Sequence, residues 1–382
     1  MVCFSKLFFK KIVLLFFTAI LTFWAAGCGS ENQKEKINLK FWHSIESPHN
    51  NQLLRQKIDE FEAANPGIKI VTDNIGAQDK AMPKIMNAMA AGRQPELLWM
   101  APIYTGQMAT SGKQLKSEIF FDDPEFNSSN TWEEFRKSSI KLTQKDNNRY
   151  GFLIPMGTRE WTVWTWQTFL WQAGGGLRTE SKRPVFGQPP GVKALQSWMD
   201  LKTKHEAAVF SAADTGYKTG MFLAGRVSIM INELWNVSVL KNQDRVDYGS
   251  FFLPDYKKRS TNIGGENLYI FKSNPEQEKA AWEFAKYIMS EDFQIDWSGY
   301  IPVNRKAAES TEYVKYLEEN PFMETFVKLM KFGKSRPPVP EYSRISIIIG
   351  QGIERALYLT QSPGEALREA NKKVEDLLTD GT

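Results

Sequence analysis

The sequence predicts an α/β fold with parallel β-sheets, and two observations on residues 37–100 carry this prediction. Short apolar segments typical of strands alternate with longer segments in which apolar residues recur at helical spacing. Turn residues such as Asn65-Pro66-Gly67 separate the segments. A strand–helix–strand–helix–strand order places the strands parallel to one another, joined by right-handed crossovers.

Each element of this first region follows from a local pattern. Alternation of polar and apolar residues predicts a strand at the start, and the run Leu97-Leu98-Trp99-Met100 is typical of a buried strand. The expected strands are residues 37–42, 68–71 and 97–100. The expected helices are residues 51–64, which end at Asn65-Pro66-Gly67, and residues 82–91, which end at Gly92. Residues 43–50, with Pro48, form an expected loop.

The chain after residue 130 continues in this style without an internal repeat. Thr131-Trp132-Glu133-Glu134 is typical of a capped helix start, with Asn130 or Thr131 as the cap. The further expected strands are residues 150–155, 227–231, 248–253 and 264–271. The further expected helices are residues 161–173, 191–204, 275–289 and 363–378.

The N-terminus has the pattern of an export signal. Lys6, Lys10 and Lys11 precede an uncharged run over residues 12–26, and small residues follow. The ending at Cys28 resembles the lipobox of bacterial lipoproteins, although Ala25 stands where leucine is usual. The resemblance implies a signal peptide over residues 1–27, lipid on Cys28 and a polar tether over residues 28–36.

This signal predicts the location of the protein. A lipid on Cys28 would anchor the chain to the cell membrane, facing the extracellular or periplasmic side. The alternatives are a plain signal peptide and a signal anchor, but the apolar run is short for a spanning helix, which needs about 20 residues.

Composition excludes several classes of protein. The formal charge of +4 includes the three signal lysines, and without them 45 basic residues face 44 acidic residues, a net charge of +1. This balance argues against nucleic-acid binding and against a polybasic membrane patch. Cys3 lies in the signal, so the mature chain has no possible internal disulfide and must be stabilised by burial alone.

Short motifs over nearly all of the mature chain resemble those of the extracellular solute-binding proteins of ABC importers. The branch that they resemble holds maltose-, oligosaccharide- and glycerol-phosphate-binding proteins. The motifs are FWHS at residues 41–44 with Glu46, FEAANPG at 61–67, PELLW at 95–99, MFLAG at 221–225, YGSFFLP at 248–254, GGENL at 264–268, AWEF at 281–284, GYIPV at 299–303 and SPGEAL at 362–367.

The resemblance implies a type II periplasmic-binding-protein-like fold, in which two α/β lobes close over a ligand by a hinge motion. The implied lobe one is residues 37–116 with 260–303, and lobe two is residues 130–255 with 304–382. Residues 117–130 replace a long segment that holds the first crossover between the lobes in the family. A natural short form, a decaying gene and a sequence artefact are all compatible with this shortening.

The resemblance also implies the partners. These are a carbohydrate ligand, the transmembrane subunits of an ABC permease and the membrane reached through lipid on Cys28. We expect a monomer, no cofactor, no metal, no nucleic acid and no enzymatic activity. A sugar site needs aromatic faces and a few fixed polar groups.

Candidate ligand residues fall at several places in the sequence. The loop after the first strand offers Trp42, His43, Ser44 and Glu46 at the carboxyl end of a parallel strand, where ligands bind in such sheets. The resemblance assigns a ligand-facing carboxylate to Glu46. Core packing is the alternative for Trp42, and a structural hydrogen bond is the alternative for His43.

Further candidates come from the rest of the chain. Among Trp161, Trp164, Trp166 and Trp171, Trp161 lies at a loop–helix junction and is the candidate, while most of the others are expected in the core. The resemblance places Trp235 at a ligand-stacking position, with Glu233 beside it. Backbone amides for a ligand are expected at Gly264, Gly265 and Glu266, and the alternative there is a turn before a strand. Tyr300 lies where the resemblance places the third crossover of the chain between the lobes.

A neutral saccharide is favoured over a phosphate, because Ser346 stands near the position where the phosphate-binding members of the family carry an arginine. Arg344, two residues away, keeps the phosphate alternative open.

Two other functions are compatible with the sequence. A surface glycoside hydrolase needs two carboxylates across a cleft, which Glu46, Glu160 and Glu233 could supply. The second is a lipoprotein that keeps the fold without transport, for example as a sensor, and this alternative rests on the shortened segment 117–130. His43, His49 and His205 are too scattered in the sequence to indicate zinc.

Overall fold

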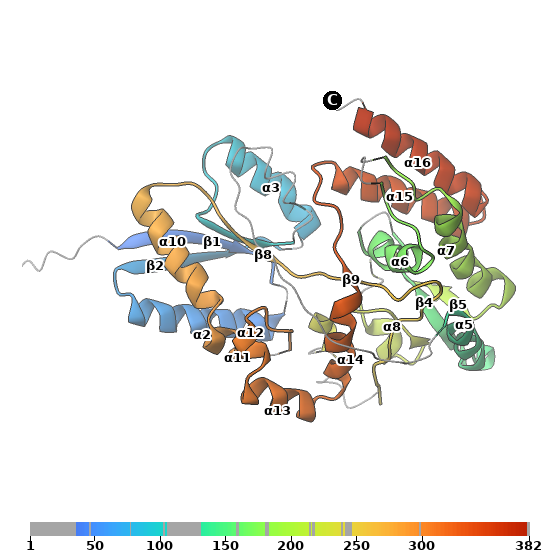
Figure 1. Cartoon of the computed structure of the whole chain (residues 1–382), viewed down its shortest axis with the longest axis horizontal. Coiled ribbons are helices and arrows are strands. Elements are labelled where there is room, and N and C mark those ends of the chain that lie inside the picture. The colour runs from blue at the N-terminus through green and yellow to red at the C-terminus, as the bar shows by residue number, and fades with distance from the viewer. Residues whose placement is uncertain are drawn as a thin grey trace, which may run out of the picture.

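The computed structural model describes residues 36–45, 47–76, 78–101, 104, 131–157, 160–179, 183–213, 215, 218–237, 240, 247–297 and 299–379. Cys28, the tether up to residue 35, Glu46 and the shortened segment 117–130 therefore lie outside the described residues. The described part forms two α/β lobes, each built around its own sheet (Figure 1). No helix in this part is long and apolar enough to cross a membrane.

Lobe one contains a four-stranded sheet in the order β2-β1-β3-β8. The strands are β1 (Ile37–His43), β2 (Ile68–Asn74), β3 (Leu97–Met100) and β8 (Asn267–Ile270). The first three are parallel, with Phe41 opposite both Thr72 and Leu97, as the strand–helix alternation predicts. Strand β8 begins at Asn267 rather than at residue 264 and runs antiparallel to β3.

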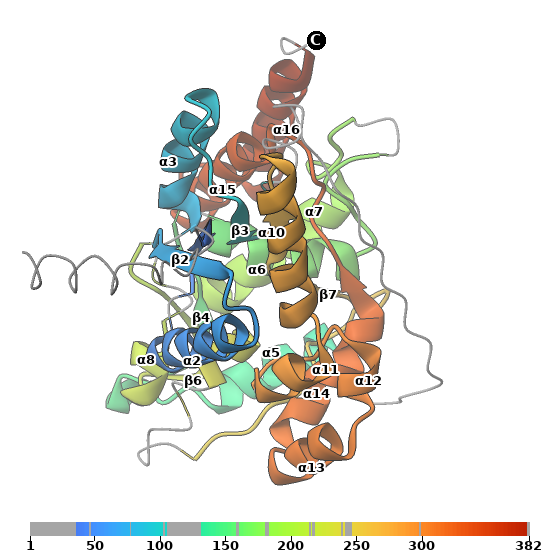
Figure 2. The same cartoon turned by 90° about the vertical axis from the view of Figure 1, so that its left-hand side faces the viewer.

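Helices cover both faces of this sheet (Figures 1 and 2). They are α2 (Pro48–Ala64), α3 (Gln78–Ala90), α10 (Pro275–Ile288) and α11 (Glu291–Asp296). Phe284 of α10 packs against Phe41 and Phe61, with ring centroids 5.6 Å and 4.9 Å apart. Helix α2 starts within the expected loop, because Ser47 caps it by accepting from the Asn50 amide at 3.4 Å and Pro48 needs no donor at the first position.

Lobe two contains a parallel three-stranded sheet in the order β5-β4-β6. Its strands are β4 (Tyr150–Ile154), β5 (Ala208–Phe210) and β6 (Val227–Ile229). The predicted cap of α5 (Trp132–Lys141) is confirmed: Thr131 accepts from the Glu134 amide at 3.2 Å, and the Glu134 carboxylate accepts from the Thr131 amide at 2.7 Å.

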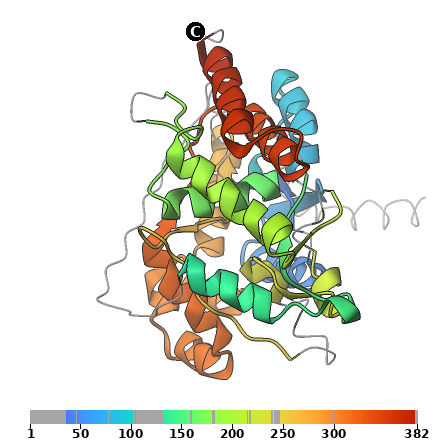
Figure 3. The ribbon, with the colours of Figure 1, turned by 90° about the vertical axis from the view of Figure 1, so that its right-hand side faces the viewer.

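Two helices pack against α6 (Glu160–Gln172) in lobe two, and a third helix packs on those two. These helices are α7 (Pro189–Met199), continued by a π-helical turn (Asp200–Lys204), α15 (Tyr342–Leu357) and α16 (Pro363–Thr379). Figure 3 shows α16 in red and α7 in yellow-green on the outer side of this lobe. Because α7, α15 and β7 all contact α6, this helix is buried on all sides, which explains how one short segment holds four tryptophans.

The remaining helices and strands are a short helix beside β6 of lobe two, a pair of strands and three helices after residue 304. They are α8 (Gly220–Leu223), the paired strands β7 (Thr261–Asn262) and β9 (Gly333–Lys334), α12 (Arg305–Ala308), α13 (Thr311–Glu319) and α14 (Phe322–Leu329). Helix α12 contacts both α11 and α13.

The prediction of a strand over residues 248–253 is wrong. Residues 247–254 follow an extended path without strand pairing, and Ser250 Oγ donates to the Phe322 carbonyl at 2.8 Å. A segment with strand-forming residues cannot form a strand when no neighbouring strand accepts its backbone hydrogen bonds.

One hydrophobic core spans the two lobes. Met82, Ile85 and Met100 from lobe one belong to the same buried cluster as Trp166 and Trp198 from lobe two. A second core, around Phe41 and Phe284, belongs to lobe one alone.

Candidate ligand cleft

A cavity of about 1470 Å³ lies between the lobes and is lined by residues of both. Lobe one contributes Ser44 directly after β1, Ala101 directly after β3, and Tyr300. Lobe two contributes Trp161 and Trp164 from α6 and the turn after β6. The lobe-one wall is therefore formed at the carboxyl ends of the parallel strands, as expected for such sheets.

The structure brings together most of the ligand residues predicted from the sequence. The predicted residues that line the cavity are Ser44, Trp161, Glu233, Trp235, Gly264, Gly265, Glu266 and Tyr300. Trp42 and His43 do not line it. Both belong to β1, which runs one residue further than expected, and Lys84 places its ammonium 4.9 Å from the Trp42 ring.

His43 is a buried structural residue, with 4% of its surface exposed. Its ring lies 5.7 Å from that of Phe41, and its Nδ1 accepts from the Ile45 amide at 3.4 Å. Burial lowers the pKa of His43 from 6.5 to about 4, with Asp73 raising it and Arg55 lowering it further.

Folding stability is expected to fall as the pH is lowered from 6.5 to 4, because the unfolded chain takes up a proton at His43 before the folded chain does. The shift corresponds to about 3 kcal/mol at most. Urea unfolding of the protein and of His43→Leu at pH 7 and pH 4.5 measures the effect, and the variant should lose less stability on acidification. The exposed His49→Gln is the control, and equal pH dependence in the protein and the His43 variant would contradict the prediction.

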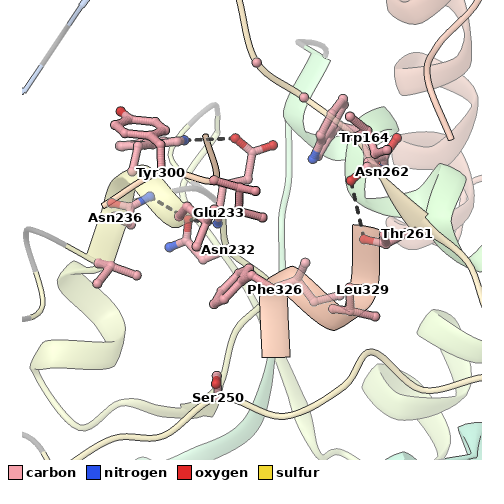
Figure 4. A pocket seen from close by; sticks show the side chains of 18 of the residues that line it. Trp164, Asn232, Glu233, Asn236, Ser250, Thr261, Asn262, Tyr300, Phe326 and Leu329 are labelled. Carbon is pink, nitrogen blue, oxygen red and sulfur yellow. Dashed lines mark hydrogen bonds between the residues drawn. The ribbon is translucent and has the colours of Figure 1, made fainter. Parts of the chain in front are cut away.

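The turn after β6 positions Glu233 and Trp235. Asn232 Oδ1 accepts from the Glu233 amide at 2.9 Å, and a 3-10 turn (Leu234–Asn236) follows. Trp235 Nε1 donates to Glu233 Oε2 at 2.9 Å. Figure 4 shows Glu233 and Tyr300 close together, with Trp164 and Asn262 across the pocket. Burial raises the pKa of Glu233 to about 7, while Trp235 and Arg336 lower it and the charges of Glu266 and Glu160 raise it.

A buried ion pair lies beside this turn, and sequence reasoning missed its cation. Arg336, which follows β9, donates through an Nη atom to Glu160 Oε1 at 2.7 Å. The Tyr342 hydroxyl donates to the same oxygen at 2.8 Å, and Ser346 Oγ donates to Glu160 Oε2 at 2.5 Å. The Arg336 guanidinium also lies 4.1 Å from the Trp164 ring centroid.

The structure changes which cation could bind a phosphate, from Arg344 to Arg336. Arg344 is exposed and does not line the cavity, and Ser346 is bound to Glu160. Arg336 is the cation that lines the cavity next to these residues, and it is paired with Glu160. No local sequence signal marks Arg336, because its partner lies 176 residues away along the chain.

An aromatic stack forms the lobe-one wall. Trp297 lies between Phe293 and Tyr300, with ring centroids at 5.5 Å and 6.3 Å and interplanar angles of 18° and 25°. The Tyr300 hydroxyl accepts from Asn50 Nδ2 at 3.2 Å. Burial is the main cause of the raised pKa of Tyr300, and the charges of Glu266 and Glu233 add to it. The ring of Trp297 thus packs against the ring of Tyr300 and supports its position.

Two of the glycines that line this cavity, Gly264 and Gly265, have a steric or conformational role. A Cβ added at Gly264 would lie 3.1 Å from Cη2 of Trp164 and 3.6 Å from Oε1 of Glu233. Gly265 has a φ of +126°, which side chains rarely adopt. Glycine at these positions lets the backbone pass between Trp164 and Glu233.

Charged side chains of both signs line the cavity within the described part of the chain. The lining cations are Lys80, Arg149 and Arg336, and the lining carboxylates are Glu160, Glu233, Asp247 and Glu266. Within the described ranges, no three His, Cys, Asp or Glu side chains are grouped as metal ligands.

Comparisons with known proteins agree with this architecture. The sequence profile of bacterial extracellular solute-binding proteins matches residues 47–295. The sn-glycerol-3-phosphate-binding periplasmic protein UgpB of Yersinia pestis is 21% identical over 420 aligned positions, covering 91% of this chain and 94% of the relative. The maltotriose-binding protein of Pyrococcus abyssi is 21% identical, covering 84% of this chain and 76% of the relative.

Solved structures show the same fold. An ABC transporter solute-binding protein of Thermotoga lettingae bound to α-D-tagatose superposes with a TM-score of 0.76 at 21% identity, covering 90% of this chain and all of that one. UgpB of Mycobacterium tuberculosis with glycerophosphocholine gives 0.75 at 16% identity, covering 90% of this chain and 99% of that one. These matches confirm the predicted two-lobe α/β fold class.

Proposed function

Because the chain belongs to the family of bacterial extracellular solute-binding proteins, which confirms the predicted non-enzymatic role, we propose that it captures a sugar or oligosaccharide between its lobes and delivers it to an ABC permease. The role of substrate-binding protein for an ABC importer follows from the family and the relatives. The carbohydrate ligand, the delivery step and the anchoring at the cell surface are the parts that we propose.

The observation that carries the carbohydrate proposal is the pairing of aromatic rings and carboxylates in one cavity. Trp161 and Trp235 from lobe two and Tyr300 from lobe one all line it, and Glu233 lies beside Trp235. Aromatic faces pack against the apolar faces of sugar rings, and carboxylates accept hydrogen bonds from hydroxyls.

The charges of the cavity support a saccharide over a phosphate ester. A phosphate group needs a cation free to form bidentate hydrogen bonds. Arg336 is held by Glu160 instead, and Glu233 adds negative charge near it. We therefore propose a ligand without a phosphate, although several relatives are sn-glycerol-3-phosphate-binding proteins.

The proposed anchor completes the role. Lipid on Cys28 and the tether over residues 28–36 would hold a monomeric receptor at the outer face of the cell membrane. Tethering raises its effective concentration near the permease subunits. The alternative of a non-transporting lipoprotein depends on the shortened segment 117–130, which lies outside the described residues.

Titration of the mature protein with malto-, xylo- and gluco-oligosaccharides is expected to give a saturable change in tryptophan fluorescence. Trp235→Ala should weaken the affinity roughly threefold to tenfold, since aromatic packing contributes about 0.5–1.5 kcal/mol. Trp282→Ala is the matched control, because Trp282 on α10 is 54% exposed and does not line the cavity.

The same titration separates the alternatives. Saturable binding without released sugar supports the binding protein, whereas a flat response in a protein that melts cooperatively favours the non-transporting alternative. An unchanged affinity in Trp235→Ala would remove Trp235 from the proposed site.

A further inference from the structure

Asn262 of β7 lines the cavity and is bound to α6 through one end of its side chain. Figure 4 shows it beside Trp164. Its Nδ2 donates to the Trp164 carbonyl at 2.5 Å and to Thr168 Oγ1 at 2.9 Å. An amide nitrogen carries two hydrogens, so both donors of this side chain are used. The nitrogen alone therefore holds the Asn262 side chain against α6.

These two hydrogen bonds also fix which way round the amide lies. The Trp164 carbonyl can only accept, so an exchange of Nδ2 and Oδ1 would bring two acceptors together. Oδ1 is buried and accepts no hydrogen bond from any described residue. Leaving a buried acceptor without a donor costs free energy, which a donor on a bound ligand would recover.

The place of Asn262 distinguishes it from most other buried polar groups without a partner. Gln167 Oε1 and Ser260 Oγ also lack a hydrogen-bond partner among the described residues, but neither residue lines the cavity. Ser44 does line it, is 8% exposed and has an Oγ without a partner in the same part of the chain. A serine hydroxyl can donate or accept, whereas the amide oxygen of Asn262 can only accept. Asn262 therefore makes the stricter demand on a ligand.

The charges beside Asn262 favour an uncharged donor. The Arg336 guanidinium lies 4.1 Å from the Trp164 ring centroid, and its charge is balanced by Glu160, whose Oε1 accepts from it at 2.7 Å. An ionised carboxylate or a fully ionised phosphate has no proton to donate to an amide oxygen. A hydroxyl group has one, and it carries no charge that the cavity would have to compensate.

We propose that Asn262 is a specificity-determining residue whose Oδ1 accepts a hydrogen bond from one ring hydroxyl of the bound sugar. This inference rests on the proposed carbohydrate-binding function. A site that hydrogen-bonds a substrate hydroxyl rejects the analogue that lacks it, because the buried acceptor is then left unpaired. The sugar must therefore carry a free hydroxyl at the position that meets Asn262.

The first test uses the unmodified mature protein and isothermal titration calorimetry. The disaccharide that binds tightest among maltose, cellobiose and xylobiose is compared with its monodeoxy and its deoxyfluoro analogues. Removal of one particular hydroxyl should weaken binding about tenfold. Replacement of the same hydroxyl by fluorine should weaken it equally, because fluorine cannot donate a hydrogen bond.

Asn262→Ala then connects that hydroxyl to Asn262. In this variant the loss at the one sensitive position should shrink from about tenfold to less than about twofold, while the losses at the other positions stay unchanged. The matched control is Asn147→Ala, because Asn147 is exposed, lies outside the cavity lining and donates to Gln144 Oε1 at 3.1 Å. The control should keep the complete pattern of losses.

A purely structural role of Asn262, as a link between β7 and α6, gives a different pattern. Asn262→Ala would then weaken all the disaccharides by the same factor and leave the loss at every position as it was. That result would overturn the inference.

The remaining outcomes separate the inference from the proposed function. If the unmodified protein binds a disaccharide but no deoxy analogue loses more than about twofold, Asn262 does not select the ligand and the carbohydrate proposal stands. Full binding of the deoxyfluoro analogue at the sensitive position would also overturn the inference, because the hydroxyl would then act as an acceptor. Binding of none of these disaccharides and of no member of the oligosaccharide panel would overturn both proposals.

Discussion

Glu160→Ala is expected to lower the free energy of unfolding by about 3–5 kcal/mol, which is the usual cost of removing one partner from a buried ion pair. The side chain of Arg336 is 7% exposed and would lose its carboxylate partner. The Tyr342 and Ser346 hydroxyls, which are buried, would lose the same acceptor. Urea unfolding of the protein and the variant measures the difference.

A double-mutant cycle separates pairing from packing. Arg336→Met keeps an unbranched side chain over Trp164 but removes the charge, and the combined variant should cost less than the sum of the two single changes. Strict additivity would contradict a direct interaction between Glu160 and Arg336. Glu283→Gln on the partly exposed surface of α10 is the control, and we expect it to change stability little.

Trp166→Ala is expected to cost about 3–5 kcal/mol of stability, as large core truncations do. Trp166 is fully buried in the core that spans the two lobes. Its indole Nε1 has no hydrogen-bond partner among the described residues. Trp166→Phe should therefore cost clearly less, because it keeps a large ring and removes the buried donor.

Thermal and urea unfolding of both variants provide the measurement. A cost below about 1 kcal/mol for Trp166→Ala would place Trp166 outside a packed core. Trp161→Ala is a useful contrast, because Trp161 is only partly buried and lines the cavity, so its main effect should be on ligand affinity.

Most of the secondary structure could be predicted because it follows from local patterns. The strands of lobe one, the capping box at Thr131 and the terminal helix α16 all carry their signal within a few residues. The prediction of a strand over residues 248–253 was wrong. A strand forms only where a neighbouring strand pairs with it, and the local sequence does not reveal that neighbour. Helix α2 was predicted to start late because the Ser47 cap was read as part of a loop.

The site was harder to predict, for reasons that particular residues make clear. His43 was expected to begin a loop, but its pairing with Asn74 and Trp99 continues β1, and the His43 side chain is buried. The burial of α6 depends on α15, which lies more than 170 residues later. Arg336 has its role only through Glu160 and Trp164, so no pattern near residue 336 could indicate it.

The core that joins Met82 and Met100 to Trp166 and Trp198 has a consequence for how the protein loses its structure. Two lobes linked only by crossing strands could melt one after the other. Here buried side chains from both lobes belong to one cluster, so we expect the unfolding of one lobe to expose apolar surface of the other. The two lobes should therefore denature in one cooperative transition, and a destabilising substitution in one lobe should lower the melting temperature of both.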